Sequence, residues 1–196
     1  MRIYRLLKSG IPIGGRPSEH TPEKMGTNEE PWYTRGAIEF LHENIKDSFD
    51  ILEYGCGSST PWFAQRAKSI TSIEHNKQWI DNVVRATPEK LMEKINIIHI
   101  ANKESGKNIG GDGFYYDEYV DYINSINMFF DLICVDGRSR SACIKNSIKY
   151  VKKNGFLLID NAERIEYKEA INQIPSNWER FVFEESMDTT IIFKVI

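Results

Sequence analysis

A glycine turn in the first half of the chain follows one acidic residue, and a second acidic residue ends the next apolar run. The stretch ILEYGCGSST places Gly55 and Gly57 after a short apolar run, with Glu53 just before them. Glycines at this spacing allow a sharp backbone turn and the close approach of a ligand. A second acid, Glu74, ends the apolar run SITSIE. Because a carboxylate at the end of such a strand can bind a ribose diol, these residues predict a site for a ligand with a ribose.

Two features separate this pattern from a dinucleotide site. Thr60 stands where the pattern G-x-G-x-x-G has its third glycine, and Glu53 would lie close to a bound diphosphate. Like charges at that distance are unfavourable. S-Adenosylmethionine has the ribose, carries cationic ammonium and sulfonium groups, and has no phosphate. The residues therefore favour S-adenosylmethionine over NAD, with Glu53 near the amino-acid end of the ligand.

Strands and helices alternate along most of the chain. Strand patterns occur at 50–55, 69–74, 95–100, 130–137 and 156–161, and helical patterns at 33–45, 61–68, 77–87, 117–126, 141–153 and 167–174. Thr60 is the expected N-cap of the second helix, with Pro61 at its first position. The runs 179–185 and 189–196 follow each other without a helix, which predicts an antiparallel edge. We therefore expect an α/β fold: a Rossmann-like three-layer sandwich with a mostly parallel seven-stranded sheet and an antiparallel C-terminal strand.

Length and composition restrict the class of protein. A chain of 196 residues is expected to form a single domain, here 1–196, with residues 1–30 as an irregular N-terminal arm or lid. The net charge of −3, without a basic block, argues against a nucleic-acid partner. No apolar run approaches the ~20 residues of a membrane span, and the first residues are not expected to form a signal peptide. Three cysteines without metal-ligand spacing predict a reduced, cytoplasmic protein.

The motifs resemble those of class I S-adenosylmethionine-dependent methyltransferases, within a subgroup of bacterial small-molecule methyltransferases. ILEYGCGSST looks like their first motif and SIEHNKQW like their second, while PWYTRGAIEFL, FFDLICVDGRSRSAC and GFLLIDNAERIEY extend the resemblance over most of the chain. It implies S-adenosyl-L-methionine as cofactor and a small-molecule acceptor as partner, without nucleic acid or membrane, and leaves a homodimer open. The expected cofactor-binding residues are Trp32, Glu53, Gly55, Gly57, Ser58, Ser59, Thr60, Glu74, His75 and Asp136.

The acceptor chemistry is expected at the ends of two later strands. Asp136 ends the fourth strand, and Asp160 and Asn161 end the fifth. Three oxygen ligands at one sheet edge could hold Mg²⁺ or another divalent cation. This arrangement resembles the metal-dependent catechol-type O-methyltransferases, which implies catalytic roles for Asp136 and Asp160 and a cation that lowers the pKa of the acceptor hydroxyl.

A second interpretation of these residues stays open. The sequence GRSR after Asp136 differs from the catechol-enzyme pattern. Asp136 could instead be a general base or a hydrogen-bond partner, with Asp160 and Asn161 capping a turn.

Several other residues are candidates for the site. Arg138, Arg140 and Arg164 could bind an acidic or hydroxyl-rich acceptor, although each is also a candidate for a solvated surface residue. Trp32 and Tyr33 could cover the cofactor or belong to the core. Among the remaining histidines, His99 is expected in the core, His42 on a helix face and His20 in the arm, from which it could reach the site.

The expected function is methyl transfer to a hydroxyl oxygen of a sugar, polyol or phenol. A nicotinamide-dependent oxidoreductase and a non-catalytic S-adenosylmethionine-binding module of the same fold are the alternatives. A nucleic-acid adenine methyltransferase would need an Asn/Asp-Pro-Pro-aromatic tetrad at the fourth strand, where this chain has VDGR. The substrate pocket is expected to be built by residues 1–30, 103–117 and 184–189.

Overall fold

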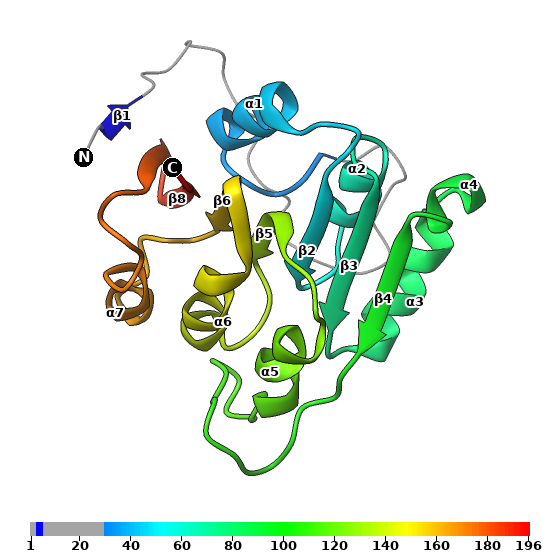
Figure 1. Ribbon diagram of the computed structural model, residues 1–196. Coiled ribbons are helices and arrows are strands. Elements are labelled where there is room, and N and C mark those ends of the chain that lie inside the picture. Colours follow the sequence, from blue (N-terminus) through cyan, green and yellow to red (C-terminus); the bar gives the residue numbers. More distant parts are fainter. Residues whose placement is uncertain (1–2, 6–29) are drawn as a thin grey trace.

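One continuous sheet organises the fold. The computed structural model describes Ile3–Arg5 and residues 30–196, which contain an eight-stranded sheet of order β1-β7-β8-β6-β5-β2-β3-β4 (Figure 1). The strands are β1 (Ile3–Arg5), β2 (Asp50–Tyr54), β3 (Ser69–Glu74), β4 (Ile95–His99), β5 (Phe130–Val135), β6 (Val151–Ile159), β7 (Glu179–Glu185) and β8 (Asp188–Lys194). Neighbours pair in parallel except β8, which is antiparallel to β6 and β7.

This topology confirms the predicted mostly parallel sheet with an antiparallel C-terminal strand. Strand β1 pairs with β7 and adds an eighth strand to the predicted seven. It comes from the segment predicted to be an irregular arm. Residues 1–2 and 6–29 of that segment, including His20, lie outside the described residues.

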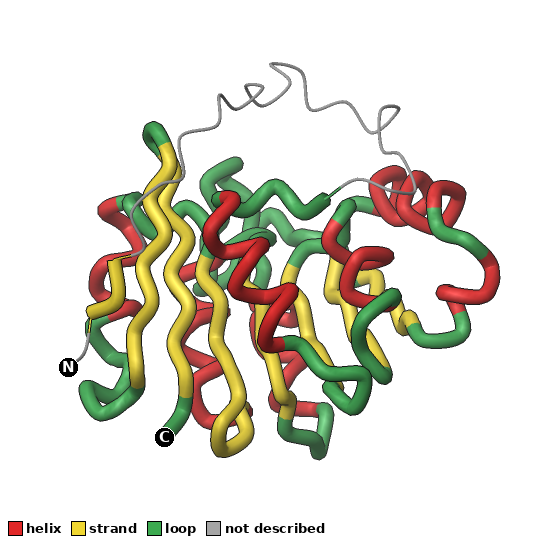
Figure 2. Tube along the Cα trace, turned by 90° about the horizontal axis from the view of Figure 1, so that it is seen from above, coloured by secondary structure: helices red, strands yellow, loops and turns green. Residues whose placement is uncertain are grey.

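Helices cover both faces of the sheet, which gives the predicted three layers (Figure 2). Helices α1 and α2 pack on one face, and α5, α6 and α7 pack on the other. The helices are α1 (Arg35–Asn44), α2 (Ser59–Ala64), α3 (Lys77–Ala86), α4 (Glu89–Met92), α5 (Asp117–Ser125), α6 (Arg140–Ser147) and α7 (Lys168–Ile171), with 3-10 turns η2 (Ile148–Tyr150) and η3 (Ile165–Tyr167). Among the described residues, no helix is both long and apolar enough to cross a membrane.

The central strands are mostly apolar because each contributes to two cores. On β2, Ile51 packs in the core with α1 and α2, while Leu52 packs in the core with α5 and α6. On β5, Leu132 and Ile133 divide between the same two cores. Successive side chains of a strand point to opposite faces, so a sheet covered on both sides favours apolar residues on both faces of its strands.

The predicted helix at 141–153 is too long. Helix α6 ends at Ser147, and β6 begins at Val151, which pairs with Phe130 of β5. Lys152 then binds Asp131 of β5 at 2.8 Å. The pairing of two buried strands therefore overrides the helical pattern of these residues, and Asn154 turns within the strand with φ of 63°.

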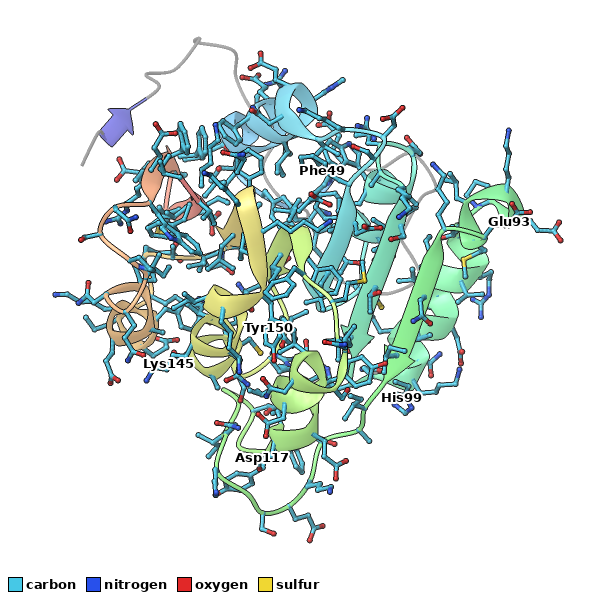
Figure 3. All side chains as sticks on the ribbon, in the orientation of Figure 1. Phe49, Glu93, His99, Asp117, Lys145 and Tyr150 are labelled. Carbon is cyan, nitrogen blue, oxygen red and sulfur yellow. The ribbon has the colours of Figure 1, made fainter. Side chains whose placement is uncertain are left out.

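Two smaller predictions about local structure are also wrong. Helix α2 begins at Ser59 with Ser58 in the N-cap position, so Thr60 lies inside the helix and does not cap it. His99 is exposed and outside the core, at the last position of β4, which is the edge strand of the sheet (Figure 3).

Backbone hydrogen bonds align the strand ends that carry the expected site. The amide of Gly55 donates to Ile73 O at 2.8 Å, and the amide of Asp136 donates to Tyr54 O at 3.1 Å. The amide of Asp160 donates to Val135 O at 3.3 Å. The residues that follow β2, β3, β5 and β6 consequently lie along one edge of the sheet.

Candidate cofactor and acceptor site

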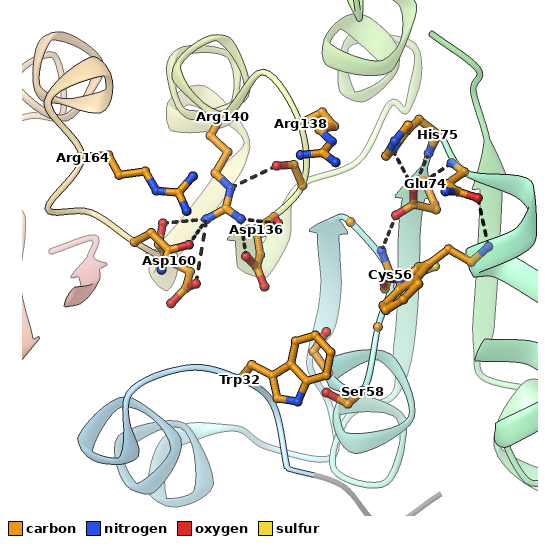
Figure 4. Close-up of a pocket in the computed structure, with 17 residues that line it drawn as sticks. Trp32, Cys56, Ser58, Glu74, His75, Asp136, Arg138, Arg140, Asp160 and Arg164 are labelled. Carbon is orange, nitrogen blue, oxygen red and sulfur yellow. Dashed lines mark hydrogen bonds and ion pairs between the residues drawn. The ribbon is translucent and has the colours of Figure 1, made fainter. Parts of the chain in front are cut away.

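A cavity of about 380 Å³ opens at this edge of the sheet (Figure 4). This volume is within the range of pockets that bind small molecules. The predicted cofactor or metal residues that line it are Trp32, Gly55, Gly57, Ser58, Ser59, Glu74, His75, Asp136, Asp160 and Asn161. The other lining residues are Cys56, Asn76, Trp79, Gly137, Arg138, Arg140 and Arg164.

The two glycines of the turn have different structural roles. Gly55 has φ of 94°, and a Cβ atom there would lie 2.8 Å from the Cα atom of Gly137. A side chain at this position is therefore excluded by backbone conformation and by the neighbouring loop. A Cβ atom at Gly57 would meet nothing within 4 Å. Gly57 thus leaves open space beside the cavity that it lines.

The amides of the turn are bonded within the protein. The amide of Gly55 is used by β3, the amide of Cys56 donates to Glu74 Oε2 at 3.2 Å, and the amide of Gly57 donates to Thr60 Oγ1 at 3.0 Å. A phosphate resting on these three residues would therefore find their amides already bonded.

Glu53 lies beneath the turn and is not among the residues that line the cavity. Its side chain is 1% exposed and accepts hydrogen bonds from the hydroxyls of Ser59, Thr60 and Ser72. Burial raises the pKa of the carboxyl group to about 7, although the three hydroxyls oppose this shift. Glu53 therefore braces the start of α2 against β3, and through Thr60 it supports the amide of Gly57.

Glu74 and its neighbours form one end of the cavity. Glu74 Oε1 accepts hydrogen bonds from the amides of His75 and Asn76, each at 2.8 Å. Its Oε2 accepts only the amide of Cys56 among the described residues, and a carboxylate oxygen can accept a second bond. Glu74 can thus offer one oxygen to a ribose hydroxyl while its other oxygen stays bonded to the backbone.

An aromatic pair adds apolar surface to the cavity. Trp32 and Trp79 lie edge to face with ring centroids 6.4 Å apart, and Trp79 Nε1 donates to Cys56 O. Burial raises the pKa of the Cys56 thiol, so this residue stays a thiol and is not a nucleophile. Sequence reasoning missed Cys56, Asn76 and Trp79, although all three adjoin residues that it identified.

Arg140 is at the centre of the other end of the cavity. Its side chain is 12% exposed and lies 2.6 Å from Asp136 Oδ1 and 3.8 Å from Asp160 Oδ2. It also donates to the main-chain oxygens of Asp136, Gly137 and Asp160 and to Asn161 Oδ1, at 2.7 to 3.1 Å. Burial alone would lower the pKa of this guanidinium, and Asp136 and the other neighbouring groups more than reverse that effect.

Comparison with known proteins identifies the fold. No protein-family model and no curated protein matches the chain. An rRNA methylase from Streptococcus thermophilus superposes with a TM-score of 0.61 at 11% identity, covering 81% of this chain and 93% of the methylase. The chain has the fold of class I methyltransferases.

Two further methyltransferases support this identification. The N-methyltransferase NodS from Bradyrhizobium japonicum WM9, in complex with S-adenosyl-L-homocysteine, has a TM-score of 0.50 at 16% identity and covers 79% of this chain and 81% of NodS. A methyltransferase from Pyrococcus furiosus has a TM-score of 0.53 at 13% identity, with 82% of each chain covered. The resemblance to class I enzymes is confirmed as a fold, and the small-molecule subgroup stays a prediction.

Within this methyltransferase fold, the predicted metal ligands come together but do not fit a cation. Asp136, Asp160 and Asn161 all point oxygens at Arg140, whose guanidinium is already the positive charge among them. Asp160 Oδ1 also accepts the hydroxyl of Thr190 at 2.9 Å. The part of the chain that the structure describes contains no group of three or more His, Cys, Asp or Glu residues suited to a metal ion. The prediction of Mg²⁺ at these residues is not supported.

The loops expected to build the pocket contribute only indirectly. No residue of 103–117 or 184–189 lines the cavity. Asp112 instead lies 3.5 Å from Arg138, and Asp188 accepts a hydrogen bond from Asn161. His42 is exposed on α1, and Tyr33 is buried in the core beside α1 and α2.

The two glycines are expected to respond differently to substitution. Gly55→Ala should lower the free energy of unfolding by at least about 1 kcal/mol, because φ is positive and Gly137 lies against it. Gly57→Ala should leave stability unchanged and weaken S-adenosyl-L-homocysteine binding by about tenfold, or 1.4 kcal/mol. Chemical denaturation and calorimetric titration of both variants measure this. Wild-type stability of Gly55→Ala would mean that the turn relaxes more easily than its geometry implies.

Glu53 should make the protein less stable as pH rises. The unfolded chain loses the Glu53 proton above its ordinary pKa of 4.5, whereas the folded chain keeps it until pH about 7. Between these values the free energy of unfolding should fall by about 3 kcal/mol because of this residue, and remain level above pH 7. Denaturation from pH 5 to 8 should show a shallower decline for Glu53→Gln than for wild type. The exposed Glu43→Gln is the control, and equal slopes for both variants would contradict the assignment.

Proposed function

We propose that the chain binds S-adenosyl-L-methionine and transfers its methyl group to a hydroxyl oxygen of a small molecule. The observation that carries this proposal is the pairing of Glu74 with a glycine turn whose amides are already bonded. Such a site suits a ligand with a ribose diol and no phosphate. The methyltransferase fold and the S-adenosyl-L-homocysteine complex of NodS are consistent with this ligand.

The groups that oppose NAD binding in the structure differ from the one expected from the sequence. Glu53 was expected to repel a diphosphate, but it is buried and its pKa of about 7 leaves much of it neutral at neutral pH. The stronger objection is that Gly55, Cys56 and Gly57 have no free amide for a phosphate. A dinucleotide fold relies on such amides at its glycine turn.

Asp136 is the best-placed residue to receive the acceptor hydroxyl. Its carboxylate is 29% exposed, lines the cavity and is fixed in orientation by Arg140. S-Adenosylmethionine would supply a methyl group on a sulfonium sulfur. Asp136 would orient the hydroxyl oxygen toward that methyl carbon and take the hydroxyl proton as the O–C bond forms and the C–S bond breaks, so that neutral sulfur leaves in S-adenosyl-L-homocysteine. Asp160 is 3% exposed and would act by positioning Arg140.

Charge supports a small acceptor over a nucleic acid. An rRNA methylase shares the fold, which makes RNA the second candidate acceptor. RNA binding requires many contacts from Lys and Arg to phosphates, and this chain has a net charge of −3. The three buried free cysteines support the proposed cytoplasmic location. A single domain and a homodimer remain part of the proposal.

Ligand titration separates the proposed function from its rivals. We expect S-adenosyl-L-homocysteine to bind at micromolar concentration and NAD not to bind. Glu74→Gln should weaken S-adenosyl-L-homocysteine binding by about 1.5–3 kcal/mol, because the ribose loses a charged acceptor. Glu93→Gln, far from the cavity at the end of α4, is the matched control (Figure 3). Tight NAD binding would refute the proposal, and binding without methyl transfer to any acceptor would favour the non-catalytic module.

The acceptor chemistry is expected to proceed in the presence of a chelator. Because the guanidinium of Arg140 already occupies the place of a cation between Asp136 and Asp160, excess EDTA should leave the rate unchanged. Asp136→Asn should lower kcat at least ~100-fold and leave S-adenosyl-L-homocysteine affinity unchanged. A screen of sugar, polyol and phenol acceptors with labelled S-adenosylmethionine provides the assay, and Asp81→Asn on the exposed face of α3 is the control. Loss of activity in EDTA that Mg²⁺ restores would show that a cation is needed after all.

A further inference from the structure

The acceptor end of the cavity carries positive charge that its own residues do not neutralise. Three guanidinium groups, from Arg138, Arg140 and Arg164, line this end, together with the two carboxylates of Asp136 and Asp160. In Figure 4 the three arginines come from the segments that follow β5 and β6. Their contacts differ, and this difference identifies which charge is available to a ligand.

The guanidinium of Arg140 is not available to a ligand. Both carboxylates and four further oxygens surround it, and its side chain is only 12% exposed. Arg138 is partly engaged. Its Nε atom lies 3.5 Å from Asp112 Oδ2, an oxygen that also accepts the hydroxyl of Tyr116 at 2.6 Å.

The guanidinium of Arg164 is the one of the three that remains available to a ligand. Its guanidinium donates to the hydroxyl of Tyr167 at 3.3 Å and forms no ion pair with any described residue. It is exposed, lines the cavity, and its amide is fixed by Asn161 O at 3.2 Å. The side chain therefore stands at the mouth of the cavity with one hydrogen bond to a neutral hydroxyl and with donors left over, on the same short segment as Asp160 and Asn161.

We propose that the methyl acceptor carries an anionic group, a carboxylate or a phosphate, and that Arg164 binds it. This inference rests on the proposed methyl transfer and names the class of its substrate. A guanidinium presents paired donors that match either anion in a bidentate manner. With that group at Arg164, a hydroxyl elsewhere on the same molecule reaches inward to Asp136. Arg138 adds to the positive potential at the mouth without being required for the contact.

The carboxylate of S-adenosylmethionine itself is the competing occupant of Arg164. The test therefore uses protein saturated with S-adenosyl-L-homocysteine, so that the cofactor end is already filled. Inorganic phosphate, glucose 6-phosphate, glucuronate and neutral glucose are titrated at equal ionic strength by calorimetry. The variants are Arg164→Gln and Arg164→Lys, with Arg85→Gln on the exposed face of α3 as control.

Glucose 6-phosphate or glucuronate is expected to bind the saturated wild-type protein at least tenfold more tightly than glucose. Arg164→Gln should remove this preference, Arg164→Lys should keep part of it, and Arg85→Gln should keep all of it. S-Adenosyl-L-homocysteine affinity should be the same in all four proteins.

Three results would overturn the inference. They are a loss of S-adenosyl-L-homocysteine affinity in Arg164→Gln, equal anion binding by Arg164→Gln and wild type, and no anion binding by the saturated wild type. Failure of the wild type to bind S-adenosyl-L-homocysteine is a separate result that refutes the proposed function.

Discussion

The buried guanidinium of Arg140 is the interaction on which the acceptor end of the site depends. It binds main-chain oxygens that follow β5 and β6, and it also holds the side chains of Asp136, Asp160 and Asn161. Removing one partner from such a buried network would leave charges without compensation, which is strongly destabilising. The same contacts that join the two strand ends therefore set the orientation of Asp136. Stability of this edge and geometry of the proposed chemistry cannot be changed independently.

A second buried group has the corresponding role at the glycine turn. Glu53 holds Ser59, Thr60 and Ser72 from below, and Thr60 in turn occupies the amide of Gly57. The turn is thus shaped from inside the protein before any ligand arrives. Because buried polar networks are rigid when every member is bonded, the ligand meets a preformed surface. At both ends of the cavity, ionisable residues that resemble ligand contacts in the sequence serve mainly to fix the backbone around it.

The structural roles of these ionisable residues explain which parts of the site could be predicted from the sequence. The alternation of strands and helices predicts the mostly parallel sheet and the approximate strand positions, and β3 has the predicted bounds. The role of Glu53 could not be read from its position, since one residue at a strand end decides whether a side chain faces a ligand or the core. The sequence did contain an indication of where Arg140 lies. It begins α6 four residues after Asp136, and a side chain in the first turn of a helix points back toward the strand end. The prediction of a helix at 141–153 was wrong because the pairing between β5 and β6 is a tertiary interaction, which the local sequence pattern does not indicate.

The distribution of charge also narrows the acceptor in a way that the fold cannot, since one fold serves many substrates. Over long distances a chain with a net charge of −3 repels a polyanion such as RNA. At the mouth of the cavity, Arg164 and Arg138 attract negative charge over a few ångströms only, because salt screens exposed charges beyond about 10 Å. A small molecule with one anionic group gains the local attraction and experiences little of the long-range repulsion. The combination of a negative protein and a positive cavity mouth therefore favours a small anionic acceptor over a nucleic acid.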